Sequence, residues 1–232
     1  MIENYDVIVI GAGAAGLMCA AQAGQRGRKT LLLEHNEQVG KKILISGGGR
    51  CNFTNLYTEA NDFLSANEHF CKSALSRYTQ YDFLKLVEDY DIAYHEKTLG
   101  QQFCDDSAKE IVAMLLAECD KGHVDIRCNS TVSSITKNDL FEVQCKDTQY
   151  QAQSLVIATG ALSFPRLGAT DFGHQLAKQF DIHLTPLRPG LVPYTFDKET
   201  RAQYEELAGI SLDATASCNG KSFREGLLFT HK

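Results

Sequence analysis

The first 35 residues alternate two apolar runs with a glycine-rich turn and an alanine-rich segment. Residues 5–10 (YDVIVI) are continuously apolar and β-branched, which is typical of a strand buried on both faces. Residues 14–25 are rich in alanine and predict a helix, and residues 29–34 (KTLLLE) predict a second strand. A strand, a helix and a strand within about thirty residues form a βαβ unit, whose right-handed crossover makes the two strands parallel neighbours.

The pattern then becomes polar before it turns helical. Residues 35–55 predict no regular element, and a loop of this length is functional or disordered. Residues 67–91 carry apolar side chains at helical spacing and predict a helix. Ser107, followed three residues later by Glu110, predicts a capping box at the start of a helix that ends near residue 121.

A different period begins at residue 124, where short β-like runs are separated by polar turn residues. These runs predict a small antiparallel meander that leads into one more buried strand at residues 155–158. Residues 171–180 then predict another helix. The runs of the meander are residues 124–128, 132–136, 140–145 and 150–153.

Three prolines, at positions 186, 189 and 193, predict a rigid connection and a domain boundary. We therefore predict an α/β fold. We expect residues 1–189 to form one domain with a central parallel sheet, helices and an antiparallel β-meander, and residues 190–232 to begin a second, mainly β domain. Because about forty residues rarely make a core of their own, we expect the chain to be the N-terminal portion of a longer protein.

Composition and charge narrow the range of partners. The chain has 232 residues, 44% of them hydrophobic, and a net charge of -6 from 23 basic and 29 acidic residues. This acidic balance predicts no nucleic-acid partner and no membrane partner, so that any anion site must be local. The apolar run at residues 7–23 contains glycines and lacks a basic flank, which favours a core segment over a signal or membrane segment and predicts a cytoplasmic protein.

The remaining composition excludes several kinds of site. Eight cysteines are scattered without a C-x-x-C pair, which favours small buried hydrophobic side chains over disulfides or a zinc site. Neither a Ser-His-Asp set nor a metal-ligand cluster is visible, so we predict no metal and assign no catalytic residue. The sequence leaves the oligomeric state open.

A glycine fingerprint lies between the two predicted strands of the βαβ unit. Gly11, Gly13 and Gly16 form G-x-G-x-x-G, and Glu34 ends the second strand, which is the context that a dinucleotide site requires. Gly13 would let a pyrophosphate approach the backbone, and the helix N-terminus would supply unpaired N–H groups. A carboxylate at Glu34 suits ribose hydroxyls and would repel a 2′-phosphate, which favours FAD or NAD over NADP at this site.

Two further motifs point to the same cofactor. The loop SGGGRCNFTN (residues 46–55) orders three consecutive glycines at a high entropic cost, and a phosphate-bearing cofactor could offset that cost. Lys42 and Arg50 could pair with two phosphates in this acidic chain. The strand LVIATG (residues 155–160) ends in a small-residue turn that would lie near the same crevice.

Together these residues resemble a known group of flavoproteins. GAGAAG with Glu34, the meander and VIATG resemble the FAD-binding domain of the glutathione-reductase-type superfamily. The segment GKKILISGGGRCNFTN, with GALSFPRLGATDFGHQLAKQF and LRPGLVPY, resembles the BaiN/YhiN-like family of NAD(P)/FAD-dependent oxidoreductases. The resemblance implies a cofactor site formed by Gly11, Gly13, Ala14, Ala15, Gly16, Glu34, Lys42, Gly47, Gly48, Gly49, Arg50, Cys51, Asn52, Val132, Thr159 and Gly160.

The resemblance implies that residues 1–189 are a Rossmann-like FAD/NAD(P)-binding domain and that residues 190–232 begin an inserted domain on the substrate side. It also implies an activity. We expect an FAD-dependent oxidoreductase that transfers hydride between NAD(P)H and a small organic substrate that the sequence does not identify. Two alternatives stay open. One is a flavin-dependent RNA-modifying enzyme, which is disfavoured here because the chain lacks a basic tract. The other is a truncated flavin-binding fragment without catalytic activity. Cys51 could be a redox thiol beside the flavin, although a packing role is favoured because no partner cysteine is near it in the sequence.

Overall fold

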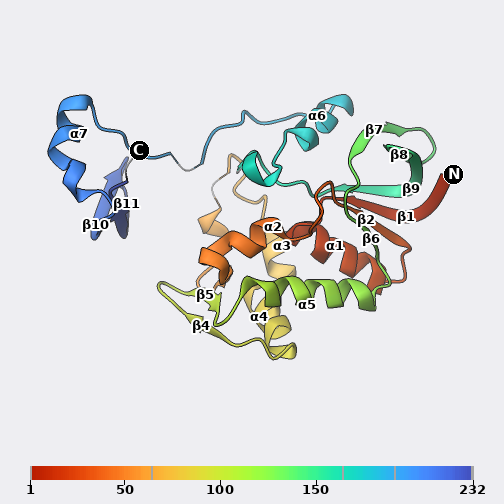
Figure 1. Ribbon diagram of the computed structural model, residues 1–232, viewed down its shortest axis with the longest axis horizontal. Helices are drawn as coiled ribbons and strands as arrows, with labels where there is room; N and C mark the ends of the chain where they lie inside the picture. The colour runs from red at the N-terminus through yellow and green to blue at the C-terminus, as the bar shows by residue number, and fades with distance from the viewer. Residues whose placement is uncertain (1, 64, 164, 191, 231–232) are drawn as a thin grey trace. The chain divides into compact units, whose positions relative to one another are not determined.

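The computed structural model describes residues 2–63, 65–163, 165–190 and 192–230. The chain divides into two compact units, Met1–Leu184 and Thr185–Lys232, which are described separately below (Figure 1). The division lies between Leu184 and Thr185, one residue before the first proline of the predicted connection, and therefore precedes the expected boundary after residue 189.

The first unit is built on a six-stranded sheet whose strand order is β6-β2-β1-β9-β8-β7 (Figure 1). β6, β2, β1 and β9 are parallel to one another, and β8 and β7 continue the sheet in antiparallel pairs. The predicted Rossmann-like arrangement of a parallel sheet with an antiparallel meander is thereby confirmed. The strands are β1 (Ile2–Ile10), β2 (Thr30–Leu33), β6 (Asp125–Arg127), β7 (Val132–Lys137), β8 (Phe141–Cys145) and β9 (Thr148–Ile157).

Two predictions about these strands were wrong. The runs at 150–153 and 155–158 are one continuous strand, β9, because β1 pairs with it from Ile2 opposite Gln149 to Ile10 opposite Ile157. The run at 124–128 does not join the meander. It forms β6 and pairs in parallel with β2. The sequence of a short apolar run does not show which strand it pairs with. For β6 and β9 the pairing partner is set by tertiary contacts.

Helices cover both faces of this sheet. On one face, α1 (Ala14–Gln25) packs against β1 and β2, and α5 (Ala108–Lys121) packs against α1; Leu17 and Leu115 are buried in the core that these elements share. The C-terminal ends of α1 and α5 approach so closely that a Cβ atom on Gly24 would lie 2.3 Å from the carbonyl oxygen of Gly122. On the other face, α6 (Phe172–Gln179) places Leu176 in a second core.

The polar stretch after β2 is ordered, contrary to the expectation of an irregular loop. It contains α2 (Lys41–Ile45), the 3₁₀ turn η1 (Ser46–Gly49) and β3 (Asn52–Asn55). Buried apolar side chains anchor it, because Val39, Ile43 and Cys51 all belong to the core beneath α1 and α5. β3 pairs with β5 (Gln101–Cys104), and β5 pairs with β4 (Tyr94–Glu96), in a separate three-stranded sheet.

The single helix predicted at residues 67–91 is two helices. α3 (Lys72–Arg77) ends before Thr79, and α4 (Gln80–Asp89) begins after it. Thr79 and Asp82 form a capping box, in which the Thr79 hydroxyl accepts from the Asp82 N–H and the Asp82 carboxylate accepts from the Thr79 N–H. This local signal for a helix start was present in the sequence.

The capping box predicted for α5 is confirmed. Ser107 Oγ accepts from the Lys109 N–H at 3.2 Å, and Glu110 Oε2 accepts from the Ser107 N–H at 3.2 Å. Two short 3₁₀ turns, η2 (Ala60–Asp62) and η3 (Pro165–Leu167), complete the elements of the first unit. Within the described ranges, no helix combines the length and the apolar character needed to cross a membrane.

The second unit contains one helix and one hairpin. α7 (Lys198–Tyr204) starts at Asp197, whose side chain accepts from the Thr200 N–H, and η4 (Glu205–Leu207) follows it. β10 (Ser211–Cys218) and β11 (Lys221–Leu228) pair in antiparallel register. The hairpin agrees with the expected β content, whereas the helix was not predicted.

A buried carboxylate joins α1, α4 and α5 beneath the first sheet. Glu118 is 8% exposed, and it accepts hydrogen bonds from Tyr90 Oη at 2.6 Å, Lys121 Nζ at 2.7 Å and Gln25 Nε2 at 2.8 Å. Burial raises the pKa of Glu118, but these hydrogen bonds outweigh it and hold the pKa below its usual value. The ionised form is therefore the one that stabilises the fold.

We expect Glu118→Gln to lower the free energy of unfolding by about 1–3 kcal/mol at pH 7, because an amide NH₂ would oppose the donors of the neighbouring side chains. The contribution of the carboxylate is complete above the usual glutamate pKa of about 4.3. It is lost as the pH falls through the lower folded value, so wild type and variant should converge in acid. Urea unfolding at several pH values measures this difference. A difference that stayed constant down to low pH would contradict the assignment.

Candidate functional site

The carboxyl ends of three parallel strands meet at one edge of the main sheet. Ile10 of β1 lies opposite Leu33 of β2 on one side and opposite Ile157 of β9 on the other. A pocket of about 440 Å³ opens at this edge, where ligands of open α/β sheets bind. The predicted cofactor residues that line the pocket are Gly11, Gly13, Ala14, Ala15, Lys42, Val132, Thr159 and Gly160.

The three glycines of the fingerprint have different roles. Gly11 has a φ of +100°, and a Cβ there would lie 2.7 Å from the Ala158 carbonyl oxygen. A Cβ on Gly16 would lie 1.8 Å from the Gly11 carbonyl oxygen, so Gly16 lets α1 pack against the turn. A Cβ on Gly13 would meet no atom of the chain within 4 Å and would enter open space. Gly11 and Gly16 are therefore required by the fold, whereas Gly13 keeps the pocket clear for a ligand.

The first turn of α1 forms the anion-attracting part of this pocket. Gly13 is the N-cap residue and has extended backbone angles, so the N–H groups that follow it have no intrahelical partner. The first turn of α1 contains no acidic side chain that would neutralise the positive end of the helix dipole. Lys42 Nζ lies across the pocket, donates to Ser163 Oγ at 3.1 Å, and would be 3.6 Å from a Cβ on Gly160. The arrangement suits a phosphate group.

Glu34 is buried, at 6% exposure, and its carboxylate organises the backbone around the pocket. Oε2 accepts from the Ala12 N–H at 2.8 Å, inside the glycine turn. Oε1 accepts from the Asn36 N–H at 2.9 Å and from Asn36 Nδ2 at 2.7 Å. His35 Nδ1 also lies 3.2 Å from Oε1. The residues that line the pocket include His35 and Asn36, the two neighbours that follow Glu34, rather than Glu34 itself.

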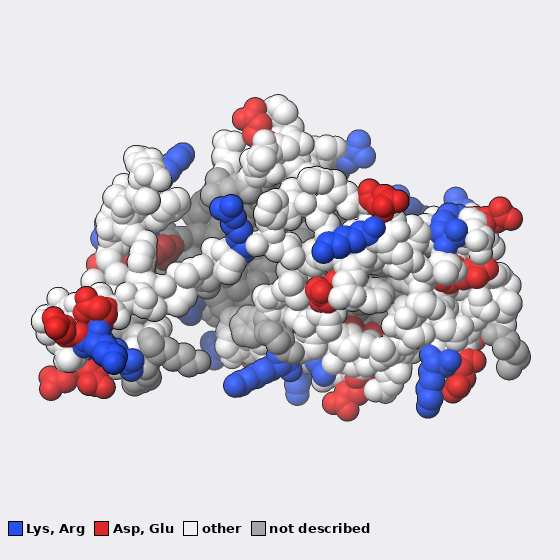
Figure 2. All heavy atoms as spheres, turned by 90° about the horizontal axis from the view of Figure 1, so that it is seen from above, with Lys and Arg blue, Asp and Glu red and all other residues white. Residues whose placement is uncertain are grey.

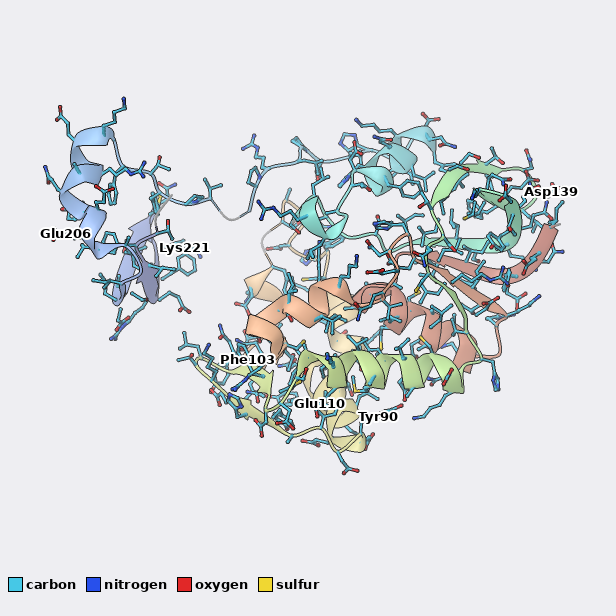
Figure 3. All side chains as sticks on the ribbon, in the orientation of Figure 1. Tyr90, Phe103, Glu110, Asp139, Glu206 and Lys221 are labelled. Carbon is cyan, nitrogen blue, oxygen red and sulfur yellow. The ribbon has the colours of Figure 1, made fainter. Side chains whose placement is uncertain are left out.

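The loop of three glycines follows α2 and lies outside the residues that line the pocket. Gly47, Gly48 and Gly49 have φ values of 58°, 68° and 91°, which favour glycine at each position. A Cβ on Gly47 would lie 2.6 Å from the ring of Phe103 in β5, so the loop packs closely on that ring (Figure 3). A cofactor role for the loop, for the exposed side chains of Arg50 and Asn52, and for Gly16 stays a prediction.

Cys51 follows this loop and is buried in the core, at 5% exposure. Burial raises the pKa of its thiol, and a hydrogen bond with Ser46 opposes the shift only in part. Burial likewise raises the pKa of the neighbouring Cys104, to about 12. Reactive cysteines need a lowered pKa and access to solvent. The environment of Cys51 therefore favours packing over redox chemistry.

Several residues at the pocket were missed by the sequence analysis. Lys41 and Asn36 line one side, and Gly168, Thr170 and Phe172 line another. Gly168 has a φ of +86°, and a Cβ there would lie 2.5 Å from His35 Nε2, so this segment packs against the residue that follows Glu34. The position of Asn36, two residues after the carboxylate of the fingerprint, was the one local signal that could have identified it. Across the part of the chain that the structure describes, no group of His, Cys, Asp and Glu side chains could hold a metal ion.

Two known proteins are similar to this chain over its whole length, and a third is similar over most of it. The chain is 52% identical to the ribosomal RNA dihydrouridine synthase of Escherichia coli strain K12, over 100% of this chain and 58% of that protein. It is 51% identical to the protein of the same name from Haemophilus influenzae, over 100% of this chain and 59% of that protein. It is also 26% identical to the 3-dehydro-bile acid delta(4,6)-reductase of Clostridium scindens, over 89% of this chain and 50% of that protein.

These relatives correct two predictions. The expected main activity, hydride transfer between NAD(P)H and a small organic substrate, was wrong, because the relatives at 52% and 51% identity are named for an RNA substrate. The prediction that the protein has no nucleic-acid partner was wrong for the same reason. Net charge averages over the whole surface, and Figure 2 shows basic side chains interspersed with acidic ones on the face that it displays. RNA bases are also held by stacking and by hydrogen bonds to their edges, which need no basic tract.

The resemblance to the BaiN/YhiN-like family is confirmed by the bile-acid reductase and by a family model. The model described as "HI0933-like protein Rossmann domain" matches residues 5–224, which include the glycine fingerprint, the sheet and the pocket at its edge. The chain spans less than two thirds of the length of the curated relatives named above. Because the family model covers nearly all of the chain, the chain belongs to the HI0933-like family.

Proposed function

We propose that this chain is the cofactor-binding part of a flavin-dependent RNA-modifying enzyme that converts uridine in ribosomal RNA to dihydrouridine. The observation that carries the proposal is the identity of 52% and 51%, over the entire chain, to two ribosomal RNA dihydrouridine synthases. The pocket at the sheet edge supports the proposal, because it combines the start of α1, open space at Gly13 and the cation of Lys42 at the edge where ligands of such sheets bind.

FAD fits the residues of this pocket. The open space at Gly13 admits a pyrophosphate to the first turn of α1, and Lys42 offers a cation on the opposite side. Thr159 and Gly160, at the end of β9, line the side of the pocket away from β2. We assign the pyrophosphate to the helix N-terminus, one nucleotide half to the β2 side, and the flavin half to the β9 side.

The chemistry is a reduction. Dihydrouridine forms when two hydrogens add across a carbon–carbon double bond of the uracil ring, as a hydride and a proton. Bound FAD would supply the hydride after reduction by NAD(P)H, which we propose as the electron donor. The residues of this chain would hold the cofactor and orient it through the glycine turn. A ribosomal RNA substrate also agrees with the expected cytoplasmic location.

Dihydrouridine formation tests the proposal directly. Ribosomal RNA from cells that lack this gene is incubated with the purified protein, FAD and either NADH or NADPH, and its nucleosides are measured by mass spectrometry. We expect dihydrouridine to form in the ribosomal RNA and none to form in a parallel reaction with an unmodified transfer RNA transcript. The proposal is wrong if the protein holds FAD and oxidises NAD(P)H but leaves the ribosomal RNA unchanged.

A further inference from the structure

Helix α3 and the start of α4 carry exposed aromatic and basic side chains that the cofactor site does not use. Phe70 is 79% exposed and Tyr81 is 61% exposed, and Tyr78 is exposed as well. Lys72 and Arg77, the first and last residues of α3, are also exposed. We call these five residues the α3 surface: Phe70, Lys72, Arg77, Tyr78 and Tyr81.

The charge of this stretch differs from the charge of the whole chain. Residues 69–81 contain two basic and no acidic residues, whereas the chain has a net charge of -6. The acidic residues at its two ends have local partners. Glu68 Oε1 lies 3.3 Å from His69 Nε2, and the Asp82 carboxylate accepts from the Thr79 N–H at 2.6 Å. The α3 surface is therefore locally positive on an acidic chain.

The two cations of the α3 surface have no carboxylate partner among the residues that the structure describes. Lys72 Nζ lies 3.1 Å from His69 Nδ1, which leaves its charge uncompensated. Lys85 in α4 differs, because its Nζ lies 2.8 Å from Asp89 Oδ1. Nucleic-acid phosphates bind where they replace the counterions of protein cations and phosphates. Lys72 and Arg77 are available for that exchange.

The backbone behind the α3 surface is anchored to the unit that carries the pocket. Gln80 Nε2, in the first residue of α4, donates to the Leu56 carbonyl oxygen at 3.0 Å. Val87 of α4 is fully buried in the same core as Ile43 of α2. The backbone that presents Tyr81 is thus held in place before a ligand arrives, which lowers the entropic cost of binding.

The proposed reaction requires an RNA segment whose bases are unstacked. Two hydrogens add to the uracil ring, so the target base must leave the stack of its neighbours. Proteins hold unstacked bases on aromatic side chains, while lysine and arginine contact the phosphates between them. The α3 surface offers both kinds of contact, with three aromatic rings and two cations within residues 70–81.

We propose that the α3 surface binds a single-stranded segment of ribosomal RNA beside the uridine that is reduced. Phe70, Tyr78 and Tyr81 stack on its bases, and Lys72 and Arg77 contact its phosphates. This inference rests on the proposed function and names the surface that holds the substrate. Because the surface contacts the RNA next to the target uridine, its members are positioning residues. They act on RNA affinity and KM rather than on kcat.

RNA binding, FAD content and stability are measured on the same variants. Ribosomal RNA from cells that lack this gene is titrated with the purified, FAD-bound protein in a filter-binding assay at several salt concentrations. The variants are Tyr81→Ala, Tyr81→Phe, which keeps an aromatic ring, and the double variant Lys72→Met/Arg77→Met. Lys85→Met is the matched control, because the ammonium group that it removes is already paired with Asp89.

We expect Tyr81→Ala to raise the Kd for ribosomal RNA about tenfold, through the loss of one stacked base. Tyr81→Phe should stay near the wild-type Kd. The double variant should flatten the slope of log K against log salt by about 1.4, since each phosphate contact to a single strand contributes about 0.7. Lys85→Met should leave that slope unchanged. FAD content, Tm and kcat at saturating RNA should keep their wild-type values in every variant.

Wild-type Kd and salt slope in Tyr81→Ala and the double variant would overturn the inference. A lowered Tm with unchanged RNA binding would also overturn it, because that result would show that the α3 surface packs against protein. A wild-type protein that bound ribosomal RNA but formed no dihydrouridine in it would instead overturn the proposed function.

Discussion

Replacement of Gly13 with valine should abolish FAD binding while the protein stays folded. The position is the N-cap of α1, its backbone is extended, and a Cβ there would meet no atom of the chain within 4 Å. The added side chain would instead occupy the space in which the pyrophosphate reaches the helix N-terminus. Loss of several charge-assisted hydrogen bonds, each worth about 1.5–3 kcal/mol, predicts a Kd at least about 100-fold higher.

The measurement compares flavin content after purification and Kd for FAD with the unfolding curve of the flavin-free variant. Loss of glycine at an N-cap costs at most about 1 kcal/mol, so the fold should survive. Gly13→Ala, with a smaller side chain, should show an intermediate loss of affinity. Stoichiometric FAD in the valine variant would show that the cofactor does not approach the backbone at Gly13, and the assigned site would be wrong.

Replacement of Gly16 with alanine should have the opposite effect and unfold much of the protein. A Cβ on Gly16 would lie 1.8 Å from the Gly11 carbonyl oxygen and 3.3 Å from the Ala158 side chain. The nearest atom is backbone and cannot rotate away, so α1 must move from the turn and from β9. Overpacking costs about 1–3 kcal/mol and occasionally more, and a contact this short against backbone belongs at the upper end. That is a large share of a typical stability of about 5–15 kcal/mol.

Gly13→Ala is the matched control, because both substitutions add one methyl group within the same six-residue turn. Urea unfolding of the flavin-free proteins should give a wild-type midpoint for Gly13→Ala and a much lower midpoint, or no folded baseline, for Gly16→Ala. Equal midpoints for the two variants would contradict the division of the fingerprint into residues required by the fold and a residue required by the ligand.

The glycine fingerprint was predictable because its physics is local. The turn at Gly11, the start of α1 and the carboxylate of Glu34 all follow from residues close in the sequence, and the structure has them in one place. The capping box at Ser107 is predictable for the same reason. The contacts of Glu34 could not be predicted from the sequence. Residue type and spacing show that a carboxylate is present, but they do not show which donors surround it.

The features that the sequence analysis missed depend on distant partners. The continuity of β9 comes from its pairing with β1 along its whole length. The order in residues 35–55 comes from buried side chains such as Ile43 and Cys51 that contact other elements. The alternative of an RNA-modifying enzyme, for which the relatives at 52% and 51% identity are named, was disfavoured for a different reason. Net charge describes the whole surface, whereas an RNA site depends on a few side chains at one place.

The pairing of β1 with β9 also sets the order in which this protein can acquire its cofactor during synthesis. β1 and β9 lie side by side in the sheet, but they are far apart in the sequence. The edge of the pocket at Ile10 can form only after Ile157 has left the ribosome and paired with it. The turn at Gly11 rests on Ala158, so the early βαβ segment alone lacks one wall of the site. Non-local pairing of this kind slows folding. A nascent chain that stopped before β9 would therefore take up no FAD, and cofactor uptake would report that the central sheet has closed.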